Sequence, residues 1–143
     1  MTTIKEITSK CKAGEISAAY EIALQELQKE HDNIWAQRKV GWALYYSIKE
    51  DIEKHAEESF FEHLDKMTEL SLLNARDDAM LFESILWKIT EFTKGIQKED
   101  FSTLTILFSK LRKFNFVPCK PYTLMMLNIL KFEGWEQLLD FIE

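Results

Sequence analysis

Glycine, proline and cysteine are all scarce in this chain. Its 143 residues include four glycines, two prolines and two cysteines. So few residues that break regular structure argue against a protein of many strands and tight turns, and favour long helices. The two cysteines, Cys11 and Cys119, are far apart and form no C-x-x-C pair. The simplest interpretation is a reduced, cytoplasmic protein.

Long hydrophobic runs are absent as well. A helix that spans a bilayer needs about 18 or more consecutive apolar residues, and charged residues interrupt every apolar run of this chain well before that length. The first residues, MTTIKEITSKCKAGE, lack the apolar core of a secretory signal. We therefore expect that the protein neither spans a membrane nor associates with one.

Catalytic and cofactor-binding patterns are missing too. The three histidines are His31, His55 and His63, and none belongs to an H-E-x-x-H motif. His55 and His63 are eight residues apart, or about 12 Å along a helix, which is too far for one metal ion without other ligands. The four glycines are isolated, so they form no phosphate-binding loop. We predict no catalytic residue, no metal site and no cofactor.

Charge is what the chain does have, and it is unevenly placed. Between residues 50 and 69 eight acids stand against two lysines, a net charge of −6, whereas residues 101 to 132 hold five cations and no acid. Such asymmetry can steer partners, although it is also common on the solvated faces of helical proteins. The candidate acidic patch is Glu53, Glu57, Glu58 and Glu62, and the candidate basic patch is Lys110, Arg112, Lys113 and Lys120.

Helical periodicity and helix-capping residues recur along the whole chain, which predicts a single all-α domain over residues 1–143. Thr3 with Glu6 is a capping-box pattern, and Gly14 and Gly95 are at positions where helices are expected to end. Lys49 to Asp51 is interpreted as a polar break between the third and fourth helices. The eight expected helices cover about 3–12, 16–27, 33–50, 51–71, 77–95, 98–114, 121–132 and 135–141.

Short connections between these helices favour four antiparallel αα-hairpins. The first of them, within AGEISAAYEIALQELQKEHDNIWAQRKVGWALYY, resembles a tetratricopeptide repeat, a helix-turn-helix unit of 34 residues. Gly14 matches the family's turn glycine, Ala19 its small residue and Leu27 its late apolar residue, while His31 replaces its usual proline. The resemblance covers about residues 5 to 48 and implies a right-handed α-solenoid. The later hairpins depart from the pattern.

The third helix carries the residues most typical of a binding surface. On a helical wheel, one face holds Ala36, Val40, Gly41, Ala43, Leu44, Ser47 and Ile48, and the other holds Trp35, Arg38, Lys39, Trp42, Tyr45, Tyr46 and Lys49. The tetratricopeptide resemblance implies that the first helix of each hairpin lines a concave groove that binds peptides. The candidate partner-binding residues are Arg38, Trp42, Tyr45, Lys49 and Trp35. Alternatively, Trp35 and Trp42 fill the core and Arg38 pairs with an acid of the fourth helix.

These patterns together predict a non-enzymatic module that binds a protein or peptide in a helical groove. The run from Trp35 to Lys49 also resembles helical-repeat segments of some bacterial conflict and phage-defence proteins. One alternative is a small inhibitor or immunity-type protein that uses the acidic helix around residues 51–69. Another is RNA binding through residues 110–131, although nucleic acid is not the expected partner of so acidic a chain. The apolar end of the sequence, WEQLLDFIE, further suggests self-association or a longer parent protein.

Overall fold

The computed structural model describes residues 2–69, 79–96, 100–111, 124–125 and 128, and these contain helices and turns but no strand. The all-α prediction is therefore confirmed for this part of the chain. The six helices are α1 (Ile4–Lys12), α2 (Ile16–Lys29), α3 (Ile34–Glu53), α4 (Glu57–Glu69), α5 (Ala79–Gly95) and α6 (Phe101–Leu111). The predicted seventh and eighth helices, with Gly134, lie outside the described residues except for Leu124, Met125 and Asn128, which are helical.

Local capping explains where the first helices begin. The side chain of Thr3 accepts a hydrogen bond from the backbone N–H of Glu6 at 3.0 Å, so the first turn of α1 is capped as predicted. Asn33 caps α3 in the same way, because its Oδ1 accepts from the backbone N–H groups of Trp35 and Ala36. In both helices the side-chain oxygen satisfies N–H groups that have no partner within the helix.

The α1–α2 turn requires glycine. Gly14 has φ +88°, a left-handed conformation that side chains disfavour. Its N–H donates to the carbonyl of Cys11, and the N–H of Glu15 donates to the carbonyl of Lys10. This double hydrogen bond is a Schellman motif, which ends α1 and turns the chain sharply toward α2.

The same motif ends α3, but in a place that the sequence analysis did not predict. His55 has φ +54°, its N–H donates to the carbonyl of Ile52, and the N–H of Ala56 donates to the carbonyl of Asp51. The expected break at Lys49 to Asp51 is wrong, since α3 continues through these residues to Glu53. The break was missed because a histidine, not a glycine, takes the left-handed position.

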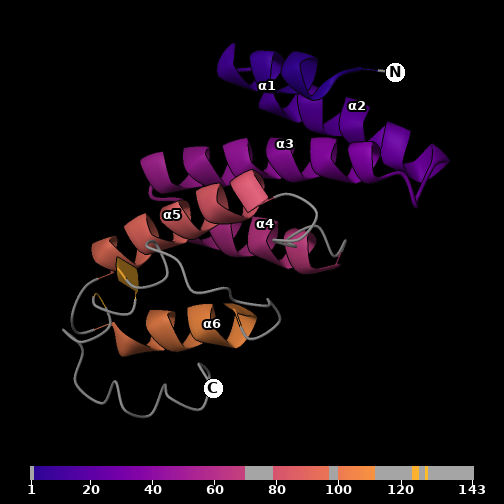
Figure 1. Ribbon diagram of the computed structural model, residues 1–143. Helices are drawn as coiled ribbons and strands as arrows, with labels where there is room; N and C mark the ends of the chain where they lie inside the picture. Colours follow the sequence, from indigo (N-terminus) through magenta and orange to yellow (C-terminus); the bar gives the residue numbers. More distant parts are fainter. Residues whose placement is uncertain (1, 70–78, 97–99, 112–123, 126–127, 129–143) are drawn as a thin grey trace.

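Helix α3 is the centre of the described structure. It contacts α1, α2, α4 and α5, while α4 also contacts α6 (Figure 1). Its side chains Ala36, Val40, Ala43, Leu44 and Ile48 are at most 1% exposed, which confirms the predicted inner face. Small residues on that face let the neighbouring helices approach closely, while Phe60, Leu64 and Met67 of α4 complete the core beside it.

Candidate binding surfaces

The first turn of α3 exposes a tryptophan with an arginine over its ring. Trp35 is 56% exposed, and Cζ of Arg38 lies 4.8 Å from the centre of the indole ring. Because a cation is attracted to the face of an indole, this contact favours one arrangement of both side chains. Because more than half of Trp35 is exposed, the alternative in which Trp35 fills the core is wrong. Ile34 beside it is 39% exposed and extends the apolar surface.

The next turns of α3 continue this surface with half-buried aromatic side chains. Trp42 meets Tyr45 edge-on with ring centres 5.5 Å apart, and Tyr45 meets Tyr46 at 5.1 Å. All three pack partly against the core. Nζ of Lys49 lies 5.9 Å from the centre of the Tyr46 ring. We call Trp35, Arg38, Trp42, Tyr45, Tyr46 and Lys49 the α3 stripe.

Burial in this stripe affects the tyrosine as well. Partial burial raises the pKa of Tyr46 above its ordinary value, with further contributions from Tyr45 and Cys11 nearby. The phenol is therefore neutral at physiological pH and available as a hydrogen-bond donor.

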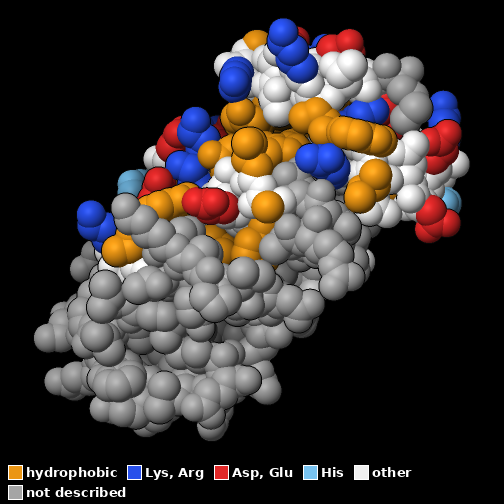
Figure 2. All heavy atoms as spheres, in the orientation of Figure 1, with side chains coloured by type: hydrophobic (Ala, Val, Ile, Leu, Met, Phe, Trp, Pro, Cys, Tyr) orange, Lys and Arg blue, Asp and Glu red, His pale blue; other side chains and the backbone are white. Residues whose placement is uncertain are grey.

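On the face shown in Figure 2, hydrophobic side chains gather across the N-terminal half of the molecule, with lysine and arginine side chains lying among them.

Lys39 does not belong to this stripe, although the helical wheel placed it there. It is only 3% exposed, and its Nζ lies 2.8 Å from Oε2 of Glu26 on α2. The wheel was wrong because α3 has neighbours on several sides, so a residue pointing away from one neighbour is buried against another. A helical wheel of α3 alone contains no information about α2.

The acidic patch is exposed on α4 and just before it. Glu53, Glu57, Glu58 and Glu62 are all exposed, and the last three line a shallow depression with Ala56 and Ser59. Glu57 also receives a hydrogen bond from the hydroxyl of Thr103 on α6, at 3.3 Å. The structure therefore brings together the three acids of α4 that the charge pattern selected.

The basic patch is different, because its one described member is neutralised. Nζ of Lys110 lies 2.8 Å from Oδ2 of Asp65 and 2.9 Å from Oδ1, and it also lies over the ring of Phe61. Lys110 thus joins α6 to α4 instead of presenting a charge for nucleic acid. Arg112, Lys113 and Lys120 lie outside the described residues.

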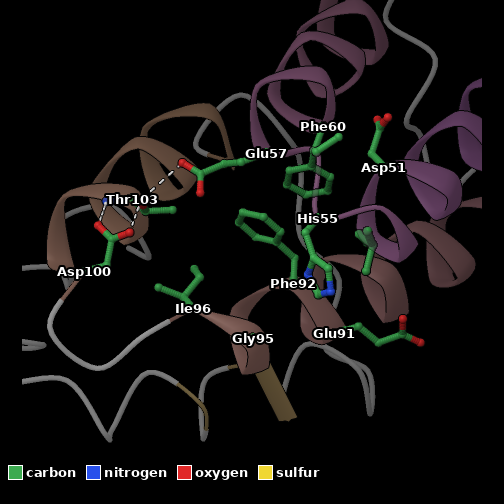
Figure 3. A pocket seen from close by; sticks show the side chains of 12 residues that line it. Asp51, His55, Glu57, Phe60, Glu91, Phe92, Gly95, Ile96, Asp100 and Thr103 are labelled. Atoms are coloured by element: carbon green, nitrogen blue, oxygen red, sulfur yellow. Dashed lines mark hydrogen bonds between the residues drawn. The ribbon is translucent and has the colours of Figure 1, made fainter.

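A pocket that the sequence analysis did not predict lies where α4, α5 and α6 meet the α3–α4 turn (Figure 3). Its volume is about 230 Å³. The rings of Phe60 and Phe92 stack at its base, with centres 4.1 Å apart and planes 20° apart. The other lining residues are Asp51, Ile52, His55, Ala56, Glu57, Glu91, Gly95, Ile96, Asp100 and Thr103.

Two of the acids in this pocket share one hydroxyl group. Oγ1 of Thr103 lies 2.6 Å from Oδ2 of Asp100 and 3.3 Å from Oε1 of Glu57. Asp100 also caps α6, since its Oδ1 accepts from the backbone N–H of Thr103 at 3.1 Å. These hydrogen bonds from Thr103, first from its side chain and then from its backbone, hold the pKa of Asp100 below its ordinary value. No sequence spacing could reveal the pocket, because its residues come from three separate stretches of the sequence, 51–60, 91–96 and 100–103.

Another of the acids that line this pocket, Asp51, connects two helices through its side chain. Asp51 of α3 is 7% exposed, and its oxygens lie 2.8 Å from Oγ of Ser59 and 2.5 Å from Nδ1 of His63. Ser59 and His63 each contact Asp51, and the pattern differs from a catalytic triad, in which the histidine contacts the serine. The cluster therefore ties α3 to α4.

No group of three or more histidine, cysteine, aspartate or glutamate side chains within residues 2–69, 79–96 and 100–111 is arranged to hold a metal ion. In the same part of the chain, no helix is long and apolar enough to cross a membrane.

Comparison with known proteins was made by sequence and by structure. No protein-family model, no curated protein and no solved structure matches the chain. The tetratricopeptide resemblance and the weaker resemblance to defence-system repeats therefore stay predictions.

Proposed function

We propose that this protein is a non-enzymatic interaction module that binds a protein or peptide along the α3 stripe. The observation that carries the proposal is the exposed Trp35 with Arg38 over its ring. Tryptophan, tyrosine and arginine are the residues that most often dominate the energy of protein interfaces. Trp35 is 56% exposed and is carried by a rigid helix. A partner that covers its indole ring therefore immobilises little additional structure, and the entropy cost of binding is small.

The arrangement of the helices supports a binding surface of this kind. Helix α3 contacts α1 as well as α2, and it also contacts α5. Such contacts are expected if the hairpins α1–α2 and α3–α4 stack as tetratricopeptide-like units, with α1, α3 and α5 in one layer. In that arrangement the α3 stripe lines the inner surface of a right-handed array of about four hairpins. A second copy of the chain is one possible occupant of this surface.

The acidic patch supports a second candidate function. Glu57, Glu58 and Glu62 are exposed together on α4 and could cover a basic site on a target, as in a small inhibitor or immunity-type protein. RNA binding has less support, since Lys110 is paired with Asp65.

The test compares two variants against a partner recovered by affinity capture, identified and then purified. The first variant carries Trp35→Ala with Arg38→Ala, and the second carries Glu57→Lys, Glu58→Lys and Glu62→Lys. Binding is measured by isothermal titration calorimetry, and folding of each variant is checked by circular dichroism. If the α3 stripe is the interface, the first variant loses at least tenfold in affinity, or about 1.4 kcal/mol, and the second retains it.

The opposite pattern would support the acidic inhibitor instead. A binding constant unaffected by the first variant would exclude the α3 stripe. Light scattering after size-exclusion chromatography tests self-association, for which the expected result is a mass above 16.9 kDa that falls toward the monomer value in the Trp35→Ala variant.

A further inference from the structure

We propose that a second pocket, between α2 and α4, binds a phosphate group through His63 and Lys66 of α4 and hydroxyl groups of α2. This pocket shares no residue with the α3 stripe, so the proposal stands independently of the function proposed above. The observation that carries it is His63, which the buried carboxylate of Asp51 holds at the wall of the cavity.

The pocket lies between α2 and α4, which both pack on α3. Its volume is about 150 Å³, which leaves room for several water molecules, since one water fills roughly 30 Å³ of the liquid. Six of the seven lining residues are polar, and they come from three helices: Ser17, Tyr20, Glu21, Ser47, His63 and Lys66, with Leu44 as the seventh. A small cavity with polar walls suits a small polar ligand better than a cofactor.

The imidazole of His63 has a fixed orientation at this wall. Its Nδ1 lies 2.5 Å from Oδ2 of Asp51, whose side chain is only 8% exposed. The hydroxyl of Ser59 donates to the other oxygen of Asp51 at 2.8 Å, which holds the carboxylate in place. An imidazole bonded through Nδ1 to a carboxylate keeps Nε2 for a ligand, and histidines that bind metals or substrates are commonly oriented in this way. The side chain of His63 is still 27% exposed.

The other polar groups of the pocket supply hydrogen-bond donors that no described acceptor uses. The side chains of Ser17, Tyr20 and Lys66 make no hydrogen bond or ion pair with another residue in the described part of the chain. The hydroxyl of Ser47 is different, because it donates to the carbonyl of Ala43 at 3.1 Å. Two hydroxyl groups from α2 and an ammonium group from α4 are therefore available to a ligand with acceptor oxygens.

A phosphate group fits these donors better than a carboxylate or a metal ion. Its oxygens point in tetrahedral directions, so it can accept from α2 and α4 at the same time, whereas a carboxylate has two oxygens in one plane. Lys66 supplies the positive charge, as lysine does in many phosphate sites. A metal ion would have only His63 and Glu21 as ordinary ligands here, and the described residues hold no group of three.

One lining residue, Glu21, opposes an anion. Its side chain is exposed on α2 and lines the same pocket as Lys66. Because like charges repel, removing the charge of Glu21 should strengthen phosphate binding, while removing that of Lys66 should weaken it. General damage to the fold would instead weaken binding in both variants.

The experiment titrates the full chain with inorganic phosphate at constant ionic strength and at about pH 6.5, near the ordinary midpoint of an imidazole. The backbone amide signals are followed by NMR. We expect phosphate to bind with a dissociation constant of about 1–10 mM and to shift signals of the pocket residues. Acetate and chloride, the matched probes for a carboxylate and a simple anion, should bind at least fivefold more weakly.

The phosphate group has two sources, the free ion and a phosphorylated side chain of a protein. Nα-acetyl-O-phospho-L-serine amide is the probe that distinguishes them. Tighter binding of this amide than of inorganic phosphate would assign the pocket to a phosphorylated protein, and weaker binding would assign it to the free ion. Equal binding would mean that the pocket recognises the phosphate group alone.

Three variants test the pocket residues. Lys66→Met and His63→Gln should each weaken phosphate binding at least fivefold, and Glu21→Gln should strengthen it at least twofold. The control is Lys29→Met, which removes an exposed cation of α2 about two helical turns beyond Glu21 and should change binding less than twofold.

Binding through Nε2 should also depend on pH. With the N–H of Nδ1 directed at Asp51, Nε2 donates to an anion only after the imidazole takes up a second proton. The titratable or charged groups around the ring are Asp51 from α3, Tyr20 and Glu21 from α2, and Lys66 from α4. Sulfate, whose own charge is constant in this range, should bind at least fivefold more weakly at pH 8 than at pH 6, and His63→Gln should remove this difference.

Several results would overturn the proposal. They are no shifts in the pocket at about 50 mM phosphate, equal binding of acetate, weaker phosphate binding in Glu21→Gln, and a loss in Lys29→Met equal to that in Lys66→Met. A pH dependence of sulfate binding that persists in His63→Gln would contradict the role of the imidazole. If a variant fails to fold, the comparison of the anions on the unchanged protein still decides the outcome.

Discussion

Lys39 of α3 and Glu26 of α2 form an ion pair inside the protein, with side chains that are only 4% and 15% exposed. Oε2 of Glu26 accepts from Nζ of Lys39 at 2.8 Å, and Oε1 accepts from both the backbone N–H and the hydroxyl of Thr2. One carboxylate thus joins the start of the chain, α2 and α3. A buried charge of this kind is costly unless all its hydrogen bonds are made.

Removal of the lysine alone should be strongly destabilising. In Lys39→Met the carboxylate of Glu26 stays buried without its cation, so we expect the free energy of unfolding to fall by about 3 kcal/mol in urea denaturation. Lys29→Met, on an exposed part of α2, is the control and should change it by less than about 0.5 kcal/mol. The double variant Lys39→Met, Glu26→Met should recover much of the loss, because no unpaired charge remains. A double variant less stable than Lys39→Met would contradict this account.

The same carboxylate predicts a dependence of stability on pH. Burial acts to raise the pKa of Glu26, but hydrogen bonds from Lys39 and Thr2 outweigh it, so the pKa is lowered in the folded protein. The unfolded chain therefore binds this proton at higher pH than the folded one does. The stability that Glu26 contributes is complete well above pH 4.5 and is lost as the pH falls below it. Urea midpoints measured from pH 7 to pH 3 should fall less steeply for Glu26→Gln than for the unchanged protein, and parallel curves would argue against the assignment.

The contacts of Asp51 predict that it stabilises the α3–α4 hairpin. Asp51→Ala loses the contacts with Ser59 and His63, and we expect the free energy of unfolding to fall by about 2–3 kcal/mol. Glu50→Ala is the matched control, since its ion pair with Lys54 is exposed and should be worth less than about 0.5 kcal/mol. Similar losses of unfolding free energy in the two variants would show that the buried contacts of Asp51 stabilise the protein no more than an exposed ion pair does.

The left-handed backbone conformation of His55 predicts that replacing it with glycine stabilises the protein. A side chain in the left-handed region is strained, and glycine is the residue that most often occupies this position of a Schellman motif. His55→Gly should raise the free energy of unfolding by about 0.5–1 kcal/mol, after the entropy that glycine gains in the unfolded chain is subtracted. His55→Ala retains the strain and should bring no gain. A lower melting temperature for His55→Gly would mean that the imidazole makes contacts worth more than the strain.

The burial of Cys11 predicts that its thiol reacts slowly with alkylating reagents in the folded protein. It is 4% exposed, and burial raises its pKa to about 11, so very little thiolate exists at pH 8. In a Cys119→Ser variant, whose single thiol is Cys11, alkylation by iodoacetamide at pH 8 should be at least a hundredfold slower in the folded protein than in urea. The unfolded sample serves as the control for reagent and pH. Equal rates in the two samples would show that Cys11 is accessible in the folded state.

The two Schellman motifs show how far local sequence signals reach. Gly14 makes its turn predictable from the sequence, because only glycine takes this conformation without strain. His55 adopts nearly the same conformation without any such signal, so the break was predicted too early, at residues 49–51. Polar residues such as Glu50 and Asp51 suit a loop, but here Asp51 is needed inside α3 to bind Ser59 and His63. A tertiary contact therefore outweighed the local pattern.

The sequence by itself determined what depends on neighbours within one turn of helix. The helical class, the cap at Thr3, the turn at Gly14 and the buried face of α3 all follow from residues at most four positions apart. Only the tertiary structure decided that Lys39 is buried against Glu26, that Lys110 is paired with Asp65, and that Glu57 meets Asp100 across Thr103. These pairs are 13 to 45 residues apart, and a charge has the same sequence signature whether it faces water or a partner.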